Sequence, residues 1–293
     1  MFVRIGGVPH HVVAEGSGPA CVLSAGLGLS WFDWDAVVPL LAPYRTVVRF
    51  DRPGHGLSGP ALVPPSAAGE AHRIAGVLDA LGLDAPATVV GHSLAGFHAE
   101  AFARLHPART ASLVLVDSSV EEDARTPAAP AVRTAAARLA GGALSALGVP
   151  AALGPLARRA AVRLARTGGG DPAPAGLVHR CYTTSRVVRG ALLENAHYRA
   201  VAAELLALRE RHPLAGTPVT VLAATAGGRR WTARQRELSL ALGARFREVT
   251  PAGHLLMLDQ PEAVARAVLG DDAPADGGED DPAADEAAAQ PLA

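Results

Sequence analysis

Residues 87–100 read A-T-V-V-G-H-S-L-A-G-F-H-A-E, a β-branched run followed by a glycine-flanked serine and a helix-forming stretch. The pattern predicts a strand, a tight turn and a helix, with Ser93 at the apex of the turn. Gly91 and Ala95 stand two residues to either side, where larger side chains would collide. Such a turn exposes the serine hydroxyl above a sheet, beside the positive end of the following helix. The alternative is a structural turn with an incidental serine, because Gly-rich turns of this kind also bind phosphates.

Size and composition limit the class of protein. With 293 residues and 49% hydrophobic content, the chain can hold one large α/β domain or a core with an inserted subdomain. Its two cysteines, Cys21 and Cys181, supply neither a disulfide framework nor metal-ligand spacing. The N-terminal residues lack the features of a signal peptide, and no apolar stretch reaches the length of a membrane helix. We therefore expect a cytoplasmic protein without stable membrane insertion.

Charge is unevenly distributed. All 27 basic residues are arginines, and the segment 271–293 holds eight acids, no base and no aromatic residue. This composition predicts a disordered acidic tail, and without it 27 arginines face 20 acids, a formal charge of +7. Arg159, Arg163 and Arg166 predict one basic helix face, either solvated or attracted to an anionic substrate or lipid surface. No basic and aromatic pattern indicates nucleic-acid binding.

Short apolar runs alternate with helical patterns along most of the chain. The expected strands are 2–5, 10–14, 21–24, 46–50, 88–90, 112–116, 219–224 and 246–249, and the expected helices are 34–41, 68–81, 94–106, 232–242 and 261–269. From about 120 to 213 only helical patterns occur, at 131–147, 155–166 and 177–211 with interruptions. We predict a mainly parallel sheet with helices on both faces, formed by 1–119 and 214–270, and a helical lid at 120–213.

A serine hydroxyl needs a base to remove its proton. His254, in the loop P-A-G-H-L-L-M-L-D, follows the last expected strand and so belongs to the sheet edge that carries Ser93. The other ten histidines compete less well. His92 is expected to point away from the apex of the turn, and His55, in the loop after an earlier strand, is a candidate pocket residue. We predict that His254 is the base.

A third group must orient the imidazole and stabilise its charged form. The loop after the strand at 219–224, where such an acid commonly sits, has no acid before Glu237. Asp117 ends the preceding strand at the same sheet edge, and we assign the role to it. Glu121 and Glu122, with Asp123, remain alternatives, and Asp117 is otherwise a strand-end aspartate that caps the next segment.

The negative oxygen of an acyl-transfer transition state needs fixed donors. One candidate is the backbone N–H of Leu94, directly after the serine. The second is the N–H of Leu27, in the loop S-A-G-L-G-L-S, where Gly26 and Gly28 let the backbone approach closely.

From about residue 1 to 270 the chain resembles the α/β-hydrolase superfamily. The resemblance rests on four segments in order: S-A-G-L-G-L-S-W-F-D-W, D-R-P-G-H-G-L-S, G-H-S-L-A-G and A-G-H-L-L-M-L-D-Q-P-E. It implies a triad of Ser93, Asp117 and His254, and some members, including haloalkane dehalogenases, place the acid after the earlier strand as here. It also implies that residues 51–58 form a structural turn. Ala25 replaces the usual histidine before the oxyanion residue, and Ser93 argues against dehalogenases and epoxide hydrolases, which use aspartate there.

We therefore expect a serine hydrolase that cleaves a small or medium, hydrophobic, ester-like substrate through an acyl-enzyme. Lactone opening, thioester cleavage, acyl transfer and carbon–carbon bond hydrolysis use the same groups. The rival from another class is a non-catalytic binding protein that keeps the pocket. We expect no metal, no organic cofactor and a small-molecule substrate as the partner, and the sequence leaves the oligomeric state open.

Overall fold

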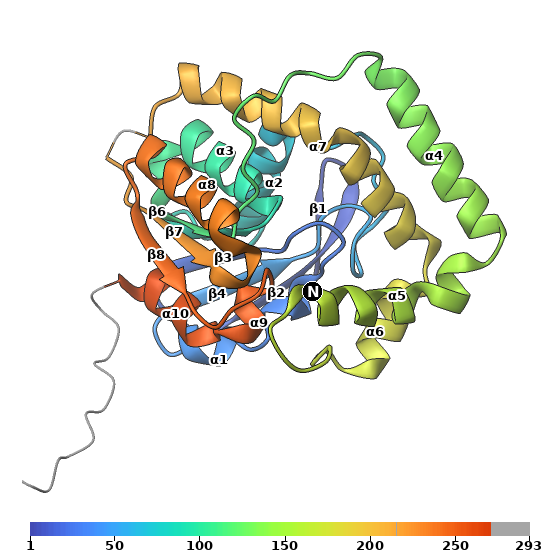
Figure 1. Ribbon diagram of the computed structural model, residues 1–293, viewed down its shortest axis with the longest axis horizontal. Coiled ribbons are helices and arrows are strands. Elements are labelled where there is room, and N and C mark those ends of the chain that lie inside the picture. Colours follow the sequence, from blue (N-terminus) through green and yellow to red (C-terminus); the bar gives the residue numbers. More distant parts are fainter. Residues whose placement is uncertain (215, 271–293) are drawn as a thin grey trace, which may run out of the picture.

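One eight-stranded sheet organises the chain. The computed structural model describes residues 1–214 and 216–270, so the predicted acidic tail at 271–293 lies outside the described residues. The sheet order is β1-β2-β4-β3-β5-β6-β7-β8 (Figure 1). The pairs β1–β2 and β2–β4 are antiparallel and the other five are parallel. The strands are β1 (Phe2–Ile5), β2 (Val8–Glu15), β3 (Ala20–Ser24), β4 (Thr46–Phe50), β5 (Ala87–His92), β6 (Thr110–Val116), β7 (Val219–Ala224) and β8 (Arg245–Val249).

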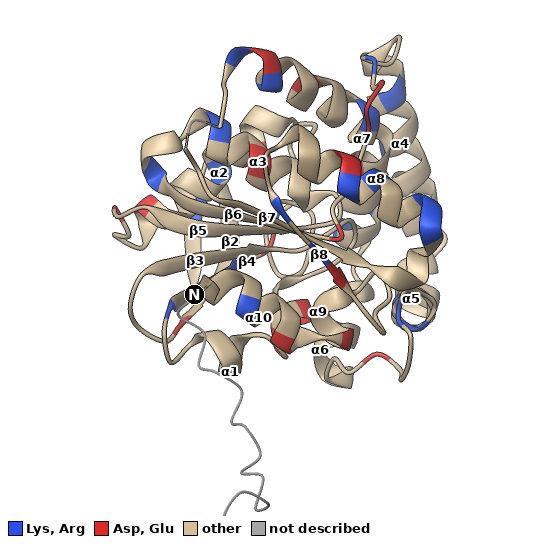
Figure 2. Cartoon of the chain, turned by 60° about the vertical axis from the view of Figure 1, so that its left-hand side comes forward, with Lys and Arg blue, Asp and Glu red and all other residues tan. Residues whose placement is uncertain are grey.

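Helices cover both faces of the sheet, with α2, α3 and α8 on one side and α1, α9 and α10 on the other (Figure 2). Successive residues of a strand point to opposite faces. Val22 and Val89 accordingly pack in one core cluster, while Leu23 and Val90 pack in the other. The helices are α1 (Val38–Leu41), α2 (Ala67–Ala80), α3 (Ala95–Leu105), α8 (Gly228–Ala241), α9 (Leu256–Asp259) and α10 (Pro261–Leu269), with short 3-10 turns at Trp31–Trp34, Pro107–Arg109 and Thr225–Gly227.

Four more helices separate β6 from β7 and make up a helical insert, called the lid below: α4 (Pro130–Ala146), α5 (Val149–Ala165), α6 (Ala175–Tyr182) and α7 (Ser185–Arg211). Figure 1 shows α4 and α5 projecting beside the sheet domain. The second half of α7 returns to the core, where Val201 and Leu205 are buried in the same cluster as the residues of α3. The predicted α/β fold with inserted helices is confirmed, and α7 serves both the lid and the core.

Element boundaries differ from the sequence-based expectation mainly in the lid. The pattern predicts a helix from Pro155, since proline is favoured at the first helical position. In the structure α5 starts at Val149, Pro150 is its second residue, and Pro155 lies inside the helix. The single pattern at 177–211 is divided, because α6 ends at Tyr182 and α7 starts at Ser185.

No single helix in the two described ranges is long and apolar enough to span a bilayer. Helices α4 and α5 meet the length and composition criteria only together, as a pair bent by 104°.

Candidate active site

Ser93 occupies a strained turn between β5 and α3. Its φ of 53° lies in the left-handed region that non-glycine residues rarely adopt. A side chain at position 91 would meet the carbonyl oxygen of Ala95 at 2.4 Å, and one at position 96 would meet Ser118 Oγ at 2.0 Å. The turn therefore needs glycine at 91 and 96, and it tolerates the methyl group of Ala95.

The three residues assigned from sequence meet above the sheet. His254 Nε2 lies 3.0 Å from Ser93 Oγ, and His254 Nδ1 lies 2.6 Å from Asp117 Oδ2. The side chain of His254 is 41% exposed, so solvent water can reach the imidazole, whereas that of Asp117 is 2% exposed. The geometry matches a nucleophile, a base and an orienting carboxylate in series.

Asp117 is held from several sides. It follows β6 with a φ of 42°, and its Oδ1 accepts hydrogen bonds from Trp231 Nε1 at 2.7 Å and from the Ala224 N–H at 2.9 Å. With Oδ1 occupied in this way, Oδ2 is directed at His254. Trp231, on α8, was not singled out from the sequence, because this contact depends on how α8 packs against the end of β7.

His92 lies closer to the site than the sequence predicted. The expectation that it points away from the apex is wrong: its Nε2 lies 2.8 Å from the carbonyl oxygen of His254, and the two rings are 4.8 Å apart. Burial, together with the nearby His254, keeps the pKa of His92 well below its usual value. A neutral His92 can therefore donate from Nε2 to that carbonyl and hold the loop that carries His254.

The two candidate oxyanion donors face no competing acceptor. In the described part of the chain, neither the Leu27 N–H nor the Leu94 N–H donates a hydrogen bond to a protein group. Gly26 brings the first donor close to the serine, since a Cβ at position 26 would lie 3.0 Å from Ser93 Cβ. Both N–H groups remain available to a developing negative charge.

A cavity of about 560 Å³ opens at Ser93. Its walls come from the loop at residues 27–29 and from α5 and α7 of the lid, and most of the lining side chains are apolar. The polar lining residues are His92, Ser93, Arg158, Tyr182 and His254, and none of the described lining residues is acidic.

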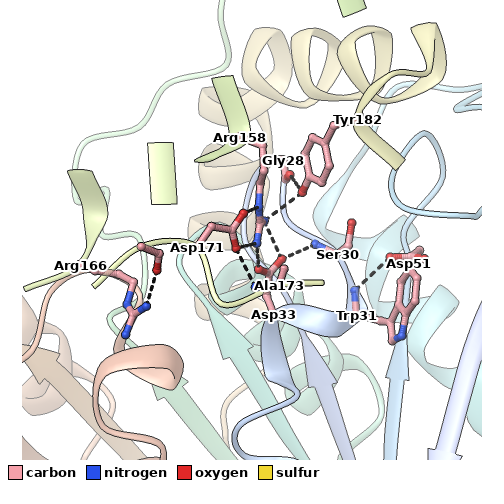
Figure 3. Close-up of polar contacts among 11 residues, drawn as sticks. Gly28, Ser30, Trp31, Asp33, Asp51, Arg158, Arg166, Asp171, Ala173 and Tyr182 are labelled. Carbon is pink, nitrogen blue, oxygen red and sulfur yellow. Dashed lines mark hydrogen bonds and ion pairs between the residues drawn. The ribbon is translucent and has the colours of Figure 1, made fainter. Parts of the chain in front are cut away.

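Among the described residues of the cavity wall, Arg158 is the one arginine, and its charge is compensated by nearby carboxylates. Its Nε lies 3.0 Å from Asp171 Oδ2, its Nη1 lies 3.0 Å from Asp33 Oδ2, and its side chain is 2% exposed (Figure 3). Burial alone would lower the pKa of Arg158, but Asp33 and its other partners outweigh that effect and raise it. The lining residues that the structure describes therefore offer no unpaired arginine or carboxylate to an ionic substrate.

The remaining candidates lie elsewhere. Glu122 is exposed and Glu121 is partly buried, and the carboxylate bonded to His254 is Asp117. His55 does not line the cavity; its Nε2 lies 3.3 Å from Glu194 Oε2 in a buried pair. Arg166 does not share an open face with Arg159, because its Nε binds Asp259 Oδ1 at 2.8 Å.

Metal ligands are not clustered here. Among residues 1–214 and 216–270, no group of three or more His, Cys, Asp or Glu side chains could hold a metal ion.

A model of the alpha/beta hydrolase family matches residues 21–267, which is most of the chain. The chain belongs to this family. RutD of Azorhizobium caulinodans, named as a carbamate hydrolase, is 34% identical over 109 residues, which cover 37% of this chain and 41% of RutD. The polyketide synthase ThaQ of Burkholderia thailandensis is 30% identical over 271 residues, 90% of this chain but 12% of ThaQ.

The fold is shared with solved structures of low sequence identity. The enol-lactonase from Burkholderia xenovorans LB400 superposes with a TM-score of 0.65 at 24% identity, covering 92% of this chain and 98% of that chain. The chain thus spans less than half of the two curated relatives and nearly the whole of this structural neighbour. Family membership assigns the fold, and the activity and the substrate have to be argued from the site itself.

Proposed function

We propose that this hydrolase cleaves a neutral, hydrophobic, small or medium ester through an acyl-enzyme on Ser93. The observation that carries the proposal is the unbroken series Ser93–His254–Asp117, with contacts of 3.0 and 2.6 Å, at the floor of an apolar cavity. A carbonyl carbon can approach Ser93 Oγ from that cavity, which the lid encloses.

In the first half of the reaction, Ser93 Oγ bonds to the ester carbonyl carbon while His254 Nε2 takes the hydroxyl proton. Asp117 holds the tautomer with the proton on Nδ1 and stabilises the imidazolium that forms. The carbonyl oxygen becomes negative and accepts hydrogen bonds from the N–H groups of Leu27 and Leu94. The bond to the leaving alkoxide breaks, and His254 returns the proton to it.

In the second half, a water molecule attacks the acyl carbon. His254 takes a proton from that water and then gives it to Ser93 Oγ as the acyl group leaves as a carboxylic acid. The partial exposure of His254 supports this step, because water has a path to the imidazole.

The cavity wall supports the substrate class. Val149, Leu153 and Val187 offer apolar contact, and the buried charge of Arg158 is paired with Asp33 and Asp171. A substrate carboxylate would have to displace one of these aspartates, so diacids and other anions fit poorly. An alcohol in place of water would give acyl transfer, and a cyclic ester would give lactone opening.

Turnover of p-nitrophenyl esters of increasing chain length, beside a lactone panel, tests the proposal. We expect release of p-nitrophenol that is lost in Ser93→Ala and His254→Ala. A protein that binds these esters without turnover would be a binding protein, and the proposal would fail.

A further inference from the structure

The loop at residues 25–30, which carries the Leu27 N–H, is held by side chains that the lid itself fixes. Arg52, at the carboxyl end of β4, donates from Nη2 to the Gly26 carbonyl at 2.9 Å and from Nη1 to the Ala25 carbonyl. The same guanidinium forms a bidentate ion pair with Glu194 of α7, with Nε–Oε1 at 2.7 Å and Nη2–Oε2 at 3.1 Å.

The bond at the Gly26 carbonyl bears directly on the proposed oxyanion donor. The Gly26 carbonyl and the Leu27 N–H belong to one planar trans peptide unit, so the N–H points opposite to the carbonyl. Fixing the position of that oxygen therefore fixes the direction of the N–H. The positive guanidinium of Arg52, which donates to the oxygen, also polarises the peptide unit and makes the N–H a stronger donor.

A second tether reaches the other side of Leu27. The Tyr182 hydroxyl, at the end of α6, donates to the Gly28 carbonyl at 2.7 Å and accepts from Arg158 Nη1 at 3.0 Å (Figure 3). Arg158 belongs to α5 and is in turn fixed by Asp33 and Asp171. Carbonyls on both sides of Leu27 are therefore bonded to groups held by three lid helices.

We propose that the lid sets the oxyanion hole: Glu194, through Arg52, and Tyr182 are positioning residues that aim the Leu27 N–H at the reacting carbonyl oxygen. The inference rests on the proposed function and deepens it, since seating of the lid and stabilisation of the transition state become one event. The turn at 51–58, to which the family resemblance assigns a structural role, supplies through Arg52 the link between lid and loop.

The link is charged over the whole range of an activity assay. Burial alone would raise the pKa of Glu194, but Arg52 and then His55 outweigh it and lower the pKa to about 2. Arg52 is 3% exposed and has no route to a neutral form near neutral pH. The Arg52–Glu194 ion pair therefore cannot be removed by a change of pH within the assay range and has to be tested by substitution.

Glu194→Gln and Tyr182→Phe test the proposal, with Glu204→Gln as the matched control. Glu204 also lies on α7 and also ties the lid to the core, through the N–H groups of Ala67 and Ala68 at 2.7 and 3.1 Å, but it does not touch the loop. We expect kcat/KM for p-nitrophenyl esters to fall roughly 10- to 100-fold in the two test variants and less than about 3-fold in the control.

Affinity for phenylboronic acid, whose tetrahedral serine adduct places an oxygen in the oxyanion hole, should fall by the same factor as kcat/KM. A merely structural role would lower the unfolding temperature and leave this affinity unchanged. The proposal is overturned if Glu194→Gln and Tyr182→Phe bind the boronate like wild type, or if Glu204→Gln loses as much. Should Glu194→Gln fail to fold, Tyr182→Phe, which removes one hydroxyl, decides alone.

Failure of the proposed function gives a different result. If the wild-type protein shows no ester turnover and no boronate adduct on Ser93, the proposed reaction is contradicted. If the wild type is active and the variants are unaffected, only the proposed role of the lid is contradicted.

Discussion

The indole of Trp231 donates a 2.7 Å hydrogen bond to Asp117, the carboxylate that directs His254. It joins α8 to the end of β6, and it satisfies one Asp117 oxygen while His254 contacts the other. The orientation of the His254 imidazole therefore depends on a tryptophan that contacts Asp117 and not His254 itself.

Trp231→Phe should lower kcat about 3- to 30-fold. The replacement keeps an aromatic ring but removes the indole donor, and a hydrogen bond to a charged group is worth about 1.5–3 kcal/mol. The Ala224 N–H still binds Oδ1, so the loss is partial. Steady-state kinetics with p-nitrophenyl butyrate measure it, and an unchanged kcat would show that Trp231 does not orient Asp117.

Asp117→Asn should be far more damaging, with kcat reduced about 10⁴-fold, because the amide favours the wrong imidazole tautomer. Glu121→Gln and Glu122→Gln serve as controls and should remain near wild type. A large loss in either control together with an active Asp117→Asn variant would move the orienting role to that glutamate.

The width of the cavity should determine chain-length preference. Ala191 of α7 lines the cavity, and phenylalanine there would occupy space needed by a longer acyl chain. In Ala191→Phe we expect the optimum of the p-nitrophenyl ester series to move to shorter chains, with acetate hydrolysis within about 3-fold of wild type.

Ala207→Phe, on the same helix but outside the cavity lining, is the control and should keep the wild-type profile. Equal profiles for Ala191→Phe and wild type would mean that the acyl chain binds elsewhere.

His98 should make the protein acid-sensitive. Burial, the main cause, lowers the pKa of His98 to about 4 in the fold, and neither ring nitrogen has a hydrogen-bond partner. In the unfolded chain the His98 imidazole binds a proton near pH 6.5, whereas in the fold it stays neutral until about pH 4. The free energy of unfolding therefore keeps its full value above pH 6.5 and decreases as the pH falls toward 4.

His98→Leu should therefore reduce the difference in unfolding free energy between pH 7.5 and pH 5 by about 2 kcal/mol. Urea unfolding at the two pH values measures it, and the exposed His179→Leu serves as the control. An unchanged difference in His98→Leu would contradict the account.

The sheet and the residues at its edge were predictable because their signals are local. Ser93 stands in a strand–glycine–helix pattern, Asp117 follows the apolar run of β6, and His254 comes shortly after β8, a strand that ends at the same edge of the sheet. The order of strands along the chain then brings them together without further information.

The supporting contacts were not predictable, because they join residues far apart in sequence whose geometry depends on packing. Arg158 and Asp33 are 125 residues apart, and Arg52 and Glu194 are 142 apart. The wrong placement of His92 has the same cause, because the carbonyl that its Nε2 contacts belongs to a residue 162 positions along the chain.

Intact-mass measurement after reaction with a fluorophosphonate tests the central claim most directly. The account predicts a single phosphonyl adduct on wild-type protein, located by peptide mapping at Ser93 and absent from Ser93→Ala. No adduct on folded wild-type protein, or an adduct that persists in Ser93→Ala, would contradict it.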